Sequence, residues 1–296
     1  MGMNADSILF LPPDNHLLVE KMLRGSPIIR CLGIFALAFV IRQATATFFS
    51  NTSYETDVVS LGSFGIILIT VLVIRFSDRD FREHGFLLPK RASRLFGVSL
   101  LLAFVFVLVV IFVPGSVSGF EASPGVAISW DLLFSAGSII LAVFAAEVVF
   151  RGYVQTGLEK ALGSYVSIAL VSVLFTLYML PITAYFTADF AGMFGLALPF
   201  LAESLFLCFF FSETKTLMCT IAFAATATIL ETITPLEPTA SDYTTLVTLM
   251  CYVFLVPIMQ MFIAEVKEQN ARTDIVPDLD EEDQIDTEMR LANRFE

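Results

Sequence analysis

The sequence predicts an all-α, polytopic membrane protein with eight transmembrane helices in one bundle, and three observations lead to this prediction. Hydrophobic residues make up 56% of the 296 residues and charged residues only 16%, whereas a soluble domain carries about 25% charged residues. The mean hydropathy is +0.80. Long apolar runs recur along the chain, and basic residues are confined to alternate connections between them. A soluble enzyme and a disordered protein are therefore excluded.

Each apolar run has about the length that a helix needs to cross a bilayer. The run 95–113 contains no charged residue and no proline, and at about 1.5 Å per residue it spans most of a ~30 Å hydrocarbon core. Helices are expected rather than strands, because a spanning segment must satisfy its backbone polar groups internally. The predicted spans are 31–49, 58–75, 95–113, 132–150, 164–180, 191–211, 216–233 and 244–264.

The distribution of Lys and Arg predicts the orientation. All 17 basic residues except Arg42 lie on the side that holds both termini, and the connections on the other side contain none. The positive-inside rule makes the basic side cytoplasmic. We therefore expect an integral, multi-pass protein with both termini in the cytoplasm, in the plasma (inner) membrane of a prokaryote or the endoplasmic reticulum of a eukaryote. The connections without basic residues are 50–57, 114–131, 181–190 and 234–243.

We expect three regions: a cytoplasmic N-terminal segment at 1–30, a membrane domain at 31–264, and an acidic, disordered cytoplasmic tail at 265–296. The tail holds much of the net charge of −12, which excludes a nucleic-acid partner. The first residues lack the basic and apolar regions of a signal peptide. The four cysteines each lie alone in an apolar stretch and are interpreted as small buried hydrophobes; they are Cys31, Cys208, Cys219 and Cys251.

Ionisable residues inside membrane spans are costly and mark candidate functional positions. Glu147 and Arg151 are four residues apart and share one helix face. They form either a structural ion pair, with Arg151 at the cytoplasmic edge of the fourth span, or one wall of a polar site. Arg42 and Glu203 are each alone in their spans, so each is expected to meet a partner from another helix or a water-filled cavity. Glu231 lies near a span end.

The segment Ala145–Gln155, with the sequence AAEVVFRGYVQ, resembles the first motif of the CPBP family, the CAAX-protease and bacteriocin-processing membrane proteins. The family pattern is Glu-Glu-x-x-x-Arg, followed by Gly and an aromatic residue. Two further motifs, Phe-x-x-x-His and His-x-x-x-Asn, lie on later spans. The resemblance covers about residues 130–230 and implies the family's bundle of eight membrane helices.

Carried over residue by residue, the resemblance implies that catalytic groups are missing from the first motif. The first Glu of the motif, which in the family is the general base that activates a water, corresponds to Ala146. The second Glu and the Arg are kept as Glu147 and Arg151. Because alanine has no group that accepts a proton, the usual base is absent.

The two later motifs depart further from the family pattern. Phe175 matches the Phe of the second motif, but Met179 stands where the family has His. The lead-in to the third motif, residues 214–217, places Ala224 at the His position and Thr228 at the Asn position. The resemblance therefore implies that both motif histidines are replaced.

No other histidine is available to take their place. The two histidines of the chain, His16 and His84, lie outside every predicted span, and Met and Ala cannot serve as imidazole ligands. The spans also lack the His or Lys that a serine or cysteine dyad needs, and they lack a pair of aspartates. A soft-metal site of Cys208, Cys219 and Met179 is the alternative to simple core packing. We predict neither a metal nor a cofactor.

We therefore expect a catalytically inactive CPBP-like protein that scaffolds or regulates a membrane-protein partner, or that holds a lipid or a hydrophobic or lipidated peptide in the bundle. The alternative is an active CAAX-type intramembrane endopeptidase that uses Glu147 as its base. A third class is a transporter or channel, which the small number of polar residues in the spans disfavours. Residues 222–228 are nearly all small, so the former catalytic cavity is expected either to be closed by tight packing or to be kept as an apolar pocket.

Overall fold

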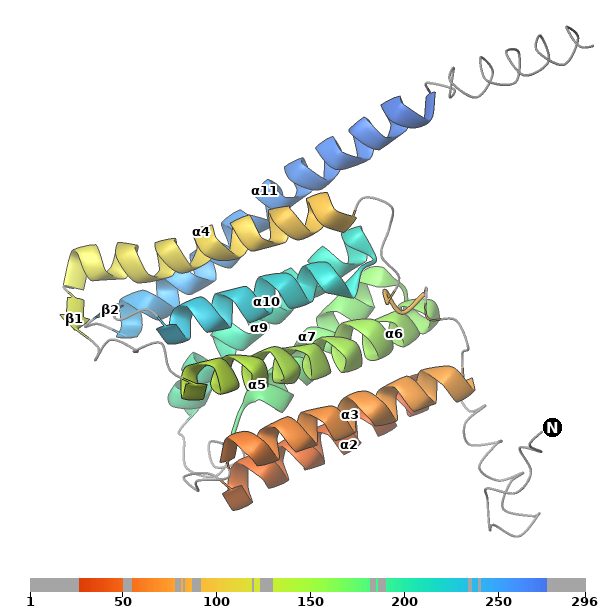
Figure 1. Cartoon of the computed structure of the whole chain (residues 1–296), viewed down its shortest axis with the longest axis horizontal. Helices are drawn as coiled ribbons and strands as arrows, with labels where there is room; N and C mark the ends of the chain where they lie inside the picture. The colour runs from red at the N-terminus through yellow and green to blue at the C-terminus, as the bar shows by residue number, and fades with distance from the viewer. Residues whose placement is uncertain are drawn as a thin grey trace, which may run out of the picture.

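The computed structural model describes residues 27–49, 55–77, 81, 83–86, 92–118, 120–122, 130–181, 185, 190–233, 236–238 and 241–275. Over these ranges the chain is almost wholly helical (Figure 1). The all-α class is thus confirmed, with one addition, a short antiparallel pair of strands, β1 (Phe120–Ala122) and β2 (Leu236–Pro238). The helices are α2 (Pro27–Phe49), α3 (Glu55–Ser77), α4 (Ala92–Ser118), α5 (Trp130–Glu147), the π-helix η2 (Val148–Gln155), α6 (Thr156–Leu162), α7 (Ser164–Met179), α9 (Phe190–Thr214), α10 (Leu217–Ile233) and α11 (Ser241–Ile275).

Each predicted span falls on a helix, and six helical segments of the described chain are long and apolar enough to cross a membrane. The exceptions are α7, with 16 residues, and α10, with 17. At about 1.5 Å per residue each is roughly 25 Å long, which is short of a ~30 Å hydrocarbon core. The count of eight crossings therefore stays a prediction for these two helices.

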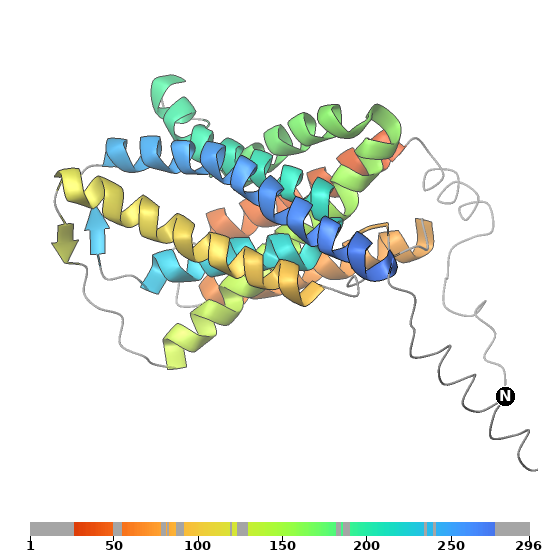
Figure 2. The ribbon, with the colours of Figure 1, turned by 90° about the horizontal axis from the view of Figure 1, so that it is seen from above.

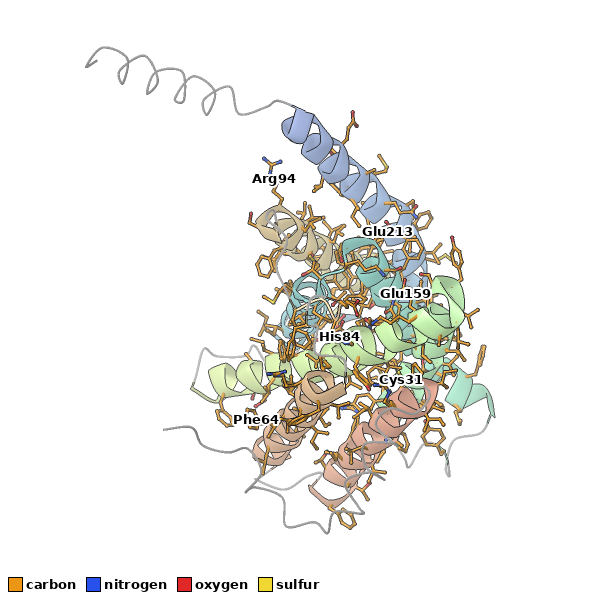
Figure 3. The ribbon with its side chains drawn as sticks, turned by 90° about the vertical axis from the view of Figure 1, so that its right-hand side faces the viewer. Cys31, Phe64, His84, Arg94, Glu159 and Glu213 are labelled. Atoms are coloured by element: carbon orange, nitrogen blue, oxygen red, sulfur yellow. The ribbon has the colours of Figure 1, made fainter. Side chains whose placement is uncertain are left out.

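The outer faces of the helices are apolar. Phe64, Phe254 and Met261 are exposed, and Figure 3 shows Phe64 on the outer side of α3. In water such a surface would associate with other apolar surfaces, whereas in a bilayer lipid chains cover it. The helices therefore indicate an integral, multi-pass membrane protein in a lipid bilayer.

Connections from separate parts of the chain meet at each end of the bundle. At one end, β1 and β2 join the connection after α4 to the connection after α10 (Figures 1 and 2). Salt bridges from Lys160 to Glu83 and from Lys215 to Glu159 join connections that the basic residues assign to the other side. The orientation of these two ends in a membrane stays a prediction.

The fourth predicted span does not end at Arg151. The helix runs from α5 through η2 into α6 and reaches Leu162, and the Arg151 side chain is fully buried. Burial within the bundle does not place Arg151 relative to a membrane surface, so its predicted position at the cytoplasmic edge stays a prediction. The described connection that holds His84 lies against the neighbouring residue, because His84 Nδ1 is 2.7 Å from the Gly152 carbonyl oxygen.

η2 lies at the centre of the packing, because it contacts α2, α3, α5, α6, α7, α9 and α10. All its side chains are buried. On one side of it, Ile66, Phe150 and Phe175 belong to a cluster built from α2, α3, η2 and α7. On the other side, a second cluster joins α4, α9, α10 and α11. α11 continues past residue 264 to Ile275, and the predicted segments before residue 27 and after residue 275 lie outside the described residues.

Candidate functional site

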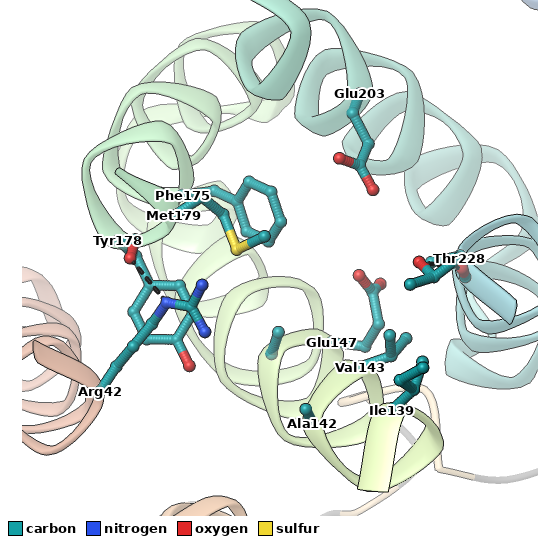
Figure 4. Close-up of a pocket in the computed structure, with 12 residues that line it drawn as sticks. Arg42, Ile139, Ala142, Val143, Glu147, Phe175, Tyr178, Met179, Glu203 and Thr228 are labelled. Atoms are coloured by element: carbon teal, nitrogen blue, oxygen red, sulfur yellow. Dashed lines mark hydrogen bonds between the residues drawn. The ribbon is translucent and has the colours of Figure 1, made fainter. Parts of the chain in front are cut away.

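A cavity of about 180 Å³ lies inside the bundle, between α2, α5, α7, α9 and α10 (Figure 4). All the motif positions that the sequence singled out line it, with the exception of Arg151. Helical spacing explains why: Phe175 and Met179 are four residues apart on α7, and Ala224 and Thr228 are four apart on α10. The lining residues are Arg42, Ile139, Ala142, Val143, Ala146, Glu147, Phe175, Tyr178, Met179, Glu203, Ala224 and Thr228.

The cavity decides between the two expectations for the small residues of α10. Ala224 lines an open space, together with the apolar side chains of Ile139, Val143 and Phe175. The expectation that tight packing closes this space is wrong, and the structure has a largely apolar pocket instead. The reason is that Ala146 and Ala224 leave volume between α5 and α10 that no neighbouring side chain fills.

Glu147 and Arg151 form a salt bridge of 3.0 Å between Oε1 and Nη1, and their side chains are 2% and 0% exposed. Arg151 Nη2 donates a hydrogen bond of 3.1 Å to Ser204 Oγ on α9. The guanidinium carbon lies 4.3 Å from the centroid of the Phe175 ring on α7. Arg151 therefore ties η2 to both α7 and α9, next to the cavity but outside its lining.

Two carboxylates face each other across the cavity. Glu147 Oε2 is buried and has no hydrogen-bond partner among the described residues. Glu203, on α9, points its carboxylate toward Glu147 (Figure 4). Within the part of the chain that the structure describes, Glu203 forms no salt bridge. The sequence marked Glu203 as a buried charge but gave no signal that it would meet the family motifs.

The hydrogen-bond partner of Arg42 is a backbone carbonyl at the end of a helix and not a carboxylate. Its Nε donates a hydrogen bond of 3.0 Å to the backbone carbonyl of Tyr178, and the next side chain, Gln43, donates one of 2.8 Å to the carbonyl of Leu180. These carbonyls lie at the C-terminus of α7, where backbone acceptors lack intrahelical partners and the helix dipole favours a cation. The guanidinium also lies 4.9 Å from the centroid of the Tyr178 ring.

The described residues that line the cavity include no histidine. His84 is buried at the far side of η2, where its Nδ1 lies 2.7 Å from the carbonyl oxygen of Gly152 and its ring stacks on Tyr153. The sequence placed His84 correctly outside the spans but did not predict its burial. His16 lies outside the described residues.

The side chains present do not form a metal site in the described ranges. No three His, Cys, Asp or Glu residues gather there. The soft-metal alternative is not supported either, because Cys208 and Cys219 belong to separate apolar clusters and neither lines the cavity that holds Met179. Met179, Ala146 and Ala224 offer a thioether and two methyl groups to the cavity, none of which is a general base.

The helix at the centre of the site has π-type hydrogen bonding from Val148 to Gln155. Such i→i+5 segments are rare and occur frequently at functional sites. Here the segment begins directly after Glu147 and contains Arg151. No periodic pattern in the sequence distinguishes it from an α-helix, so it was not predicted.

Residues 128–230 match the family model for type II CAAX prenyl endopeptidase Rce1-like proteins. Over this segment the chain is similar to the Rce1-like proteins of the CPBP family. The match begins just before α5 and includes all the lining residues except Arg42, so the resemblance seen in the sequence is confirmed over nearly the extent predicted. No curated protein matches the chain. The Rce1-like segment thus contains α5, η2, α6, α7 and α9 completely and most of α10.

Proposed function

We propose that the protein is a non-catalytic Rce1-like membrane protein whose central cavity has become a binding site. One observation carries the proposal: the cavity is present at the motif positions, but Ala146, Met179 and Ala224 stand at the base and histidine positions. Activation of a water needs a proton acceptor and, in metal-assisted hydrolysis, ligands that these side chains do not provide. Loss of the chemical groups with retention of the space favours binding over cleavage.

The ligand or partner is expected to come from the membrane. The cavity walls are largely apolar, and several flanking helices expose large hydrophobic side chains. A lipid, a hydrophobic or lipidated peptide, or a helix of a membrane-protein partner therefore suits this environment. We further propose that α7 and α10 complete eight crossings and that both termini lie in the cytoplasm, as the distribution of basic residues predicts. Reporter fusions at the two termini test this topology, and a terminus on the opposite side would contradict it.

The test of the function is a cleavage assay on a prenylated CAAX peptide with the purified full-length chain. We expect no turnover by the wild type. A matched variant restores the family residues with Ala146→Glu, Met179→His, Ala224→His and Thr228→Asn, and a gain of turnover there shows that the assay and the scaffold are competent. Turnover by the wild type that disappears in Glu147→Ala, but not in the control Glu213→Ala on α9, would overturn the proposal.

That last outcome corresponds to a second candidate function, an active endopeptidase that uses Glu147 as base. The observation that favours it is Glu147 Oε2, which is buried and unpartnered and faces the cavity. Against it, Oε1 of the same carboxylate is held in the salt bridge with Arg151. The salt bridge therefore leaves only one of the two carboxylate oxygens open toward the cavity.

A further inference from the structure

We propose that the cavity binds a zwitterion, with a primary ammonium group between Glu147, Glu203 and Thr228 and an anionic group at Arg42. This inference rests on the proposed binding function and names the chemistry of its ligand. Three features support it: the charged side chains in the cavity, the hydrogen-bond acceptors near Glu203, and the guanidinium group of Arg42 on a different wall.

Two carboxylates and two guanidinium groups lie in or beside the cavity, but only one salt bridge joins them among the described residues. Glu147 is matched by Arg151 at 3.0 Å. Arg42 and Glu203 line different walls of the cavity, and the described residues offer neither of them a salt bridge. Opposite charges that lack a counter-ion in a largely apolar cavity are costly. A ligand with one positive and one negative pole would pair both without adding net charge to the bundle.

Three acceptors converge at the Glu203 end of the cavity. Among the residues that the structure describes, none forms a hydrogen bond with Glu147 Oε2, and the Glu203 carboxylate faces it from α9 (Figure 4). The Thr228 hydroxyl donates its own hydrogen to the Ala224 carbonyl at 2.9 Å, so toward the cavity it presents only acceptor lone pairs. A primary ammonium group has three donors and no acceptor. It therefore suits this set of oxygens, whereas an anion or a neutral acceptor does not.

Arg42 supplies the opposite pole. One of its donors, Nε–H, is committed to the Tyr178 carbonyl, and its two terminal nitrogens extend past the Tyr178 ring toward the cavity in Figure 4. Arg42 and Tyr178 also line a neighbouring cavity of about 190 Å³, whose wall carries the hydroxyl side chain of Ser63. A guanidinium with a hydroxyl group nearby is a good environment for a carboxylate or a phosphate.

Size and access limit the ligand. An apolar cavity of about 150 Å³ holds one benzene molecule in a well-characterised case, so a cavity of about 180 Å³ takes a short zwitterion and not a whole lipid chain. Arg42 and Glu203 are both partly exposed rather than fully buried, so a group can reach them from outside. An ethanolamine phosphate head group on a membrane lipid and a free zwitterion of the same chemistry both meet these limits.

The experiment measures binding to the delipidated full-length protein in detergent. One arm uses phosphatidylethanolamine, with phosphatidylglycerol as the lipid that lacks the ammonium group, and native mass spectrometry as readout. The other arm uses soluble phosphoethanolamine, with glycerol phosphate as its control, and thermal unfolding as readout. We expect the ammonium-bearing member of at least one pair to bind in preference. Binding in the first arm alone identifies a lipid source, and binding in the second alone a soluble one.

The decisive variant is Glu203→Gln, which removes one pole and keeps the shape of the side chain. We expect affinity to fall about tenfold or more, as for the loss of one charged hydrogen bond, while the ligand-free variant is at least as stable as the wild type. Glu213→Gln, which removes a carboxylate from the same helix outside the cavity, leaves binding unchanged. Arg42→Lys keeps the positive pole and loses less affinity than Arg42→Gln.

Equal binding of both members of each pair, binding of neither, or unchanged affinity in Glu203→Gln would overturn the inference. These results are distinct from failure of the proposed function. Cleavage of the prenylated peptide by the wild type overturns the function whether or not a zwitterion binds. Absence of both cleavage and zwitterion binding overturns only the inference about the ligand.

Discussion

The salt bridge between Glu147 and Arg151 gives the sharpest stability prediction, because its two charges are buried and can be removed separately. Their side chains are 2% and 0% exposed. Breaking a buried pair by removing one partner leaves an uncompensated charge and costs about 3–5 kcal/mol. We expect Glu147→Gln to cost an amount in this range, since the remaining guanidinium cannot lose its proton.

The reverse change, Arg151→Met, is expected to cost less than Glu147→Gln, although it also removes the contacts with Ser204 and Phe175. A carboxylate left alone in an apolar interior can become neutral by taking up a proton. The double variant Glu147→Leu with Arg151→Met removes both charges and is expected to lie within about 2 kcal/mol of the wild type, because buried pairs are often replaceable by apolar residues.

The assay is equilibrium unfolding in mixed micelles, followed by circular dichroism, with all four proteins measured under one condition. The free energy of unfolding is compared between the single variants and the double variant. A cost below about 1 kcal/mol for Glu147→Gln would place the pair in the range of exposed salt bridges and refute the reasoning. A double variant as unstable as Glu147→Gln would refute it as well.

Three further predictions concern packing and the surface, and the same unfolding assay checks each. In Gly157→Ala the new Cβ would lie 2.6 Å from Cys31 Sγ, so we expect the free energy of unfolding to fall by about 1–3 kcal/mol from overpacking. Adding Cys31→Ala to the same chain should restore most of this loss, and no recovery would contradict the contact. Gly85 and Gly163 both have positive φ, but of these two only Gly85 has other atoms near the position of a Cβ, with Phe211 at 2.7 Å. Gly85→Ala should therefore lower the free energy of unfolding clearly more than Gly163→Ala, and equal losses would contradict this. Lys215→Met removes an exposed salt bridge and should change stability by less than about 1 kcal/mol; a larger loss would show that the pair is not solvated.

Much of the fold was predictable because hydropathy and the distribution of charge are local properties of the sequence. Each predicted span lies on a helix, and the spacing of four residues on α7 and α10 brings the motif positions to one cavity. The hydrogen bond between Arg151 and Ser204 could not be predicted, because Ser204 lies on a helix that is distant in the sequence. The hydrogen bond from Arg42 to the C-terminus of α7 could not be predicted either, because a backbone carbonyl of another helix has no sequence signature.

Two elements had no usable signal. The strands β1 and β2 have three residues each, which is too short for alternation of polar and apolar residues to be recognised. Glu203 could be identified as a buried charge, but its position opposite Glu147 depends on how α9 packs against α7 and α11. The part of the site that lies outside the motifs therefore required the three-dimensional structure.

The π-helix has a consequence for the register of the whole molecule. Residues in η2 are bonded five apart rather than four, so the turn accommodates more chain than an α-helix of the same height. Deleting one residue between Val148 and Gln155 would let the segment return to α-helical pitch and leave α6 close to its present orientation relative to α5. One residue deleted from a regular α-helix instead turns one end by about 100° against the other. The chain length of η2 can therefore change by one residue without separating α6 from the helices that it contacts, whereas the same change within α5 would not leave them in place.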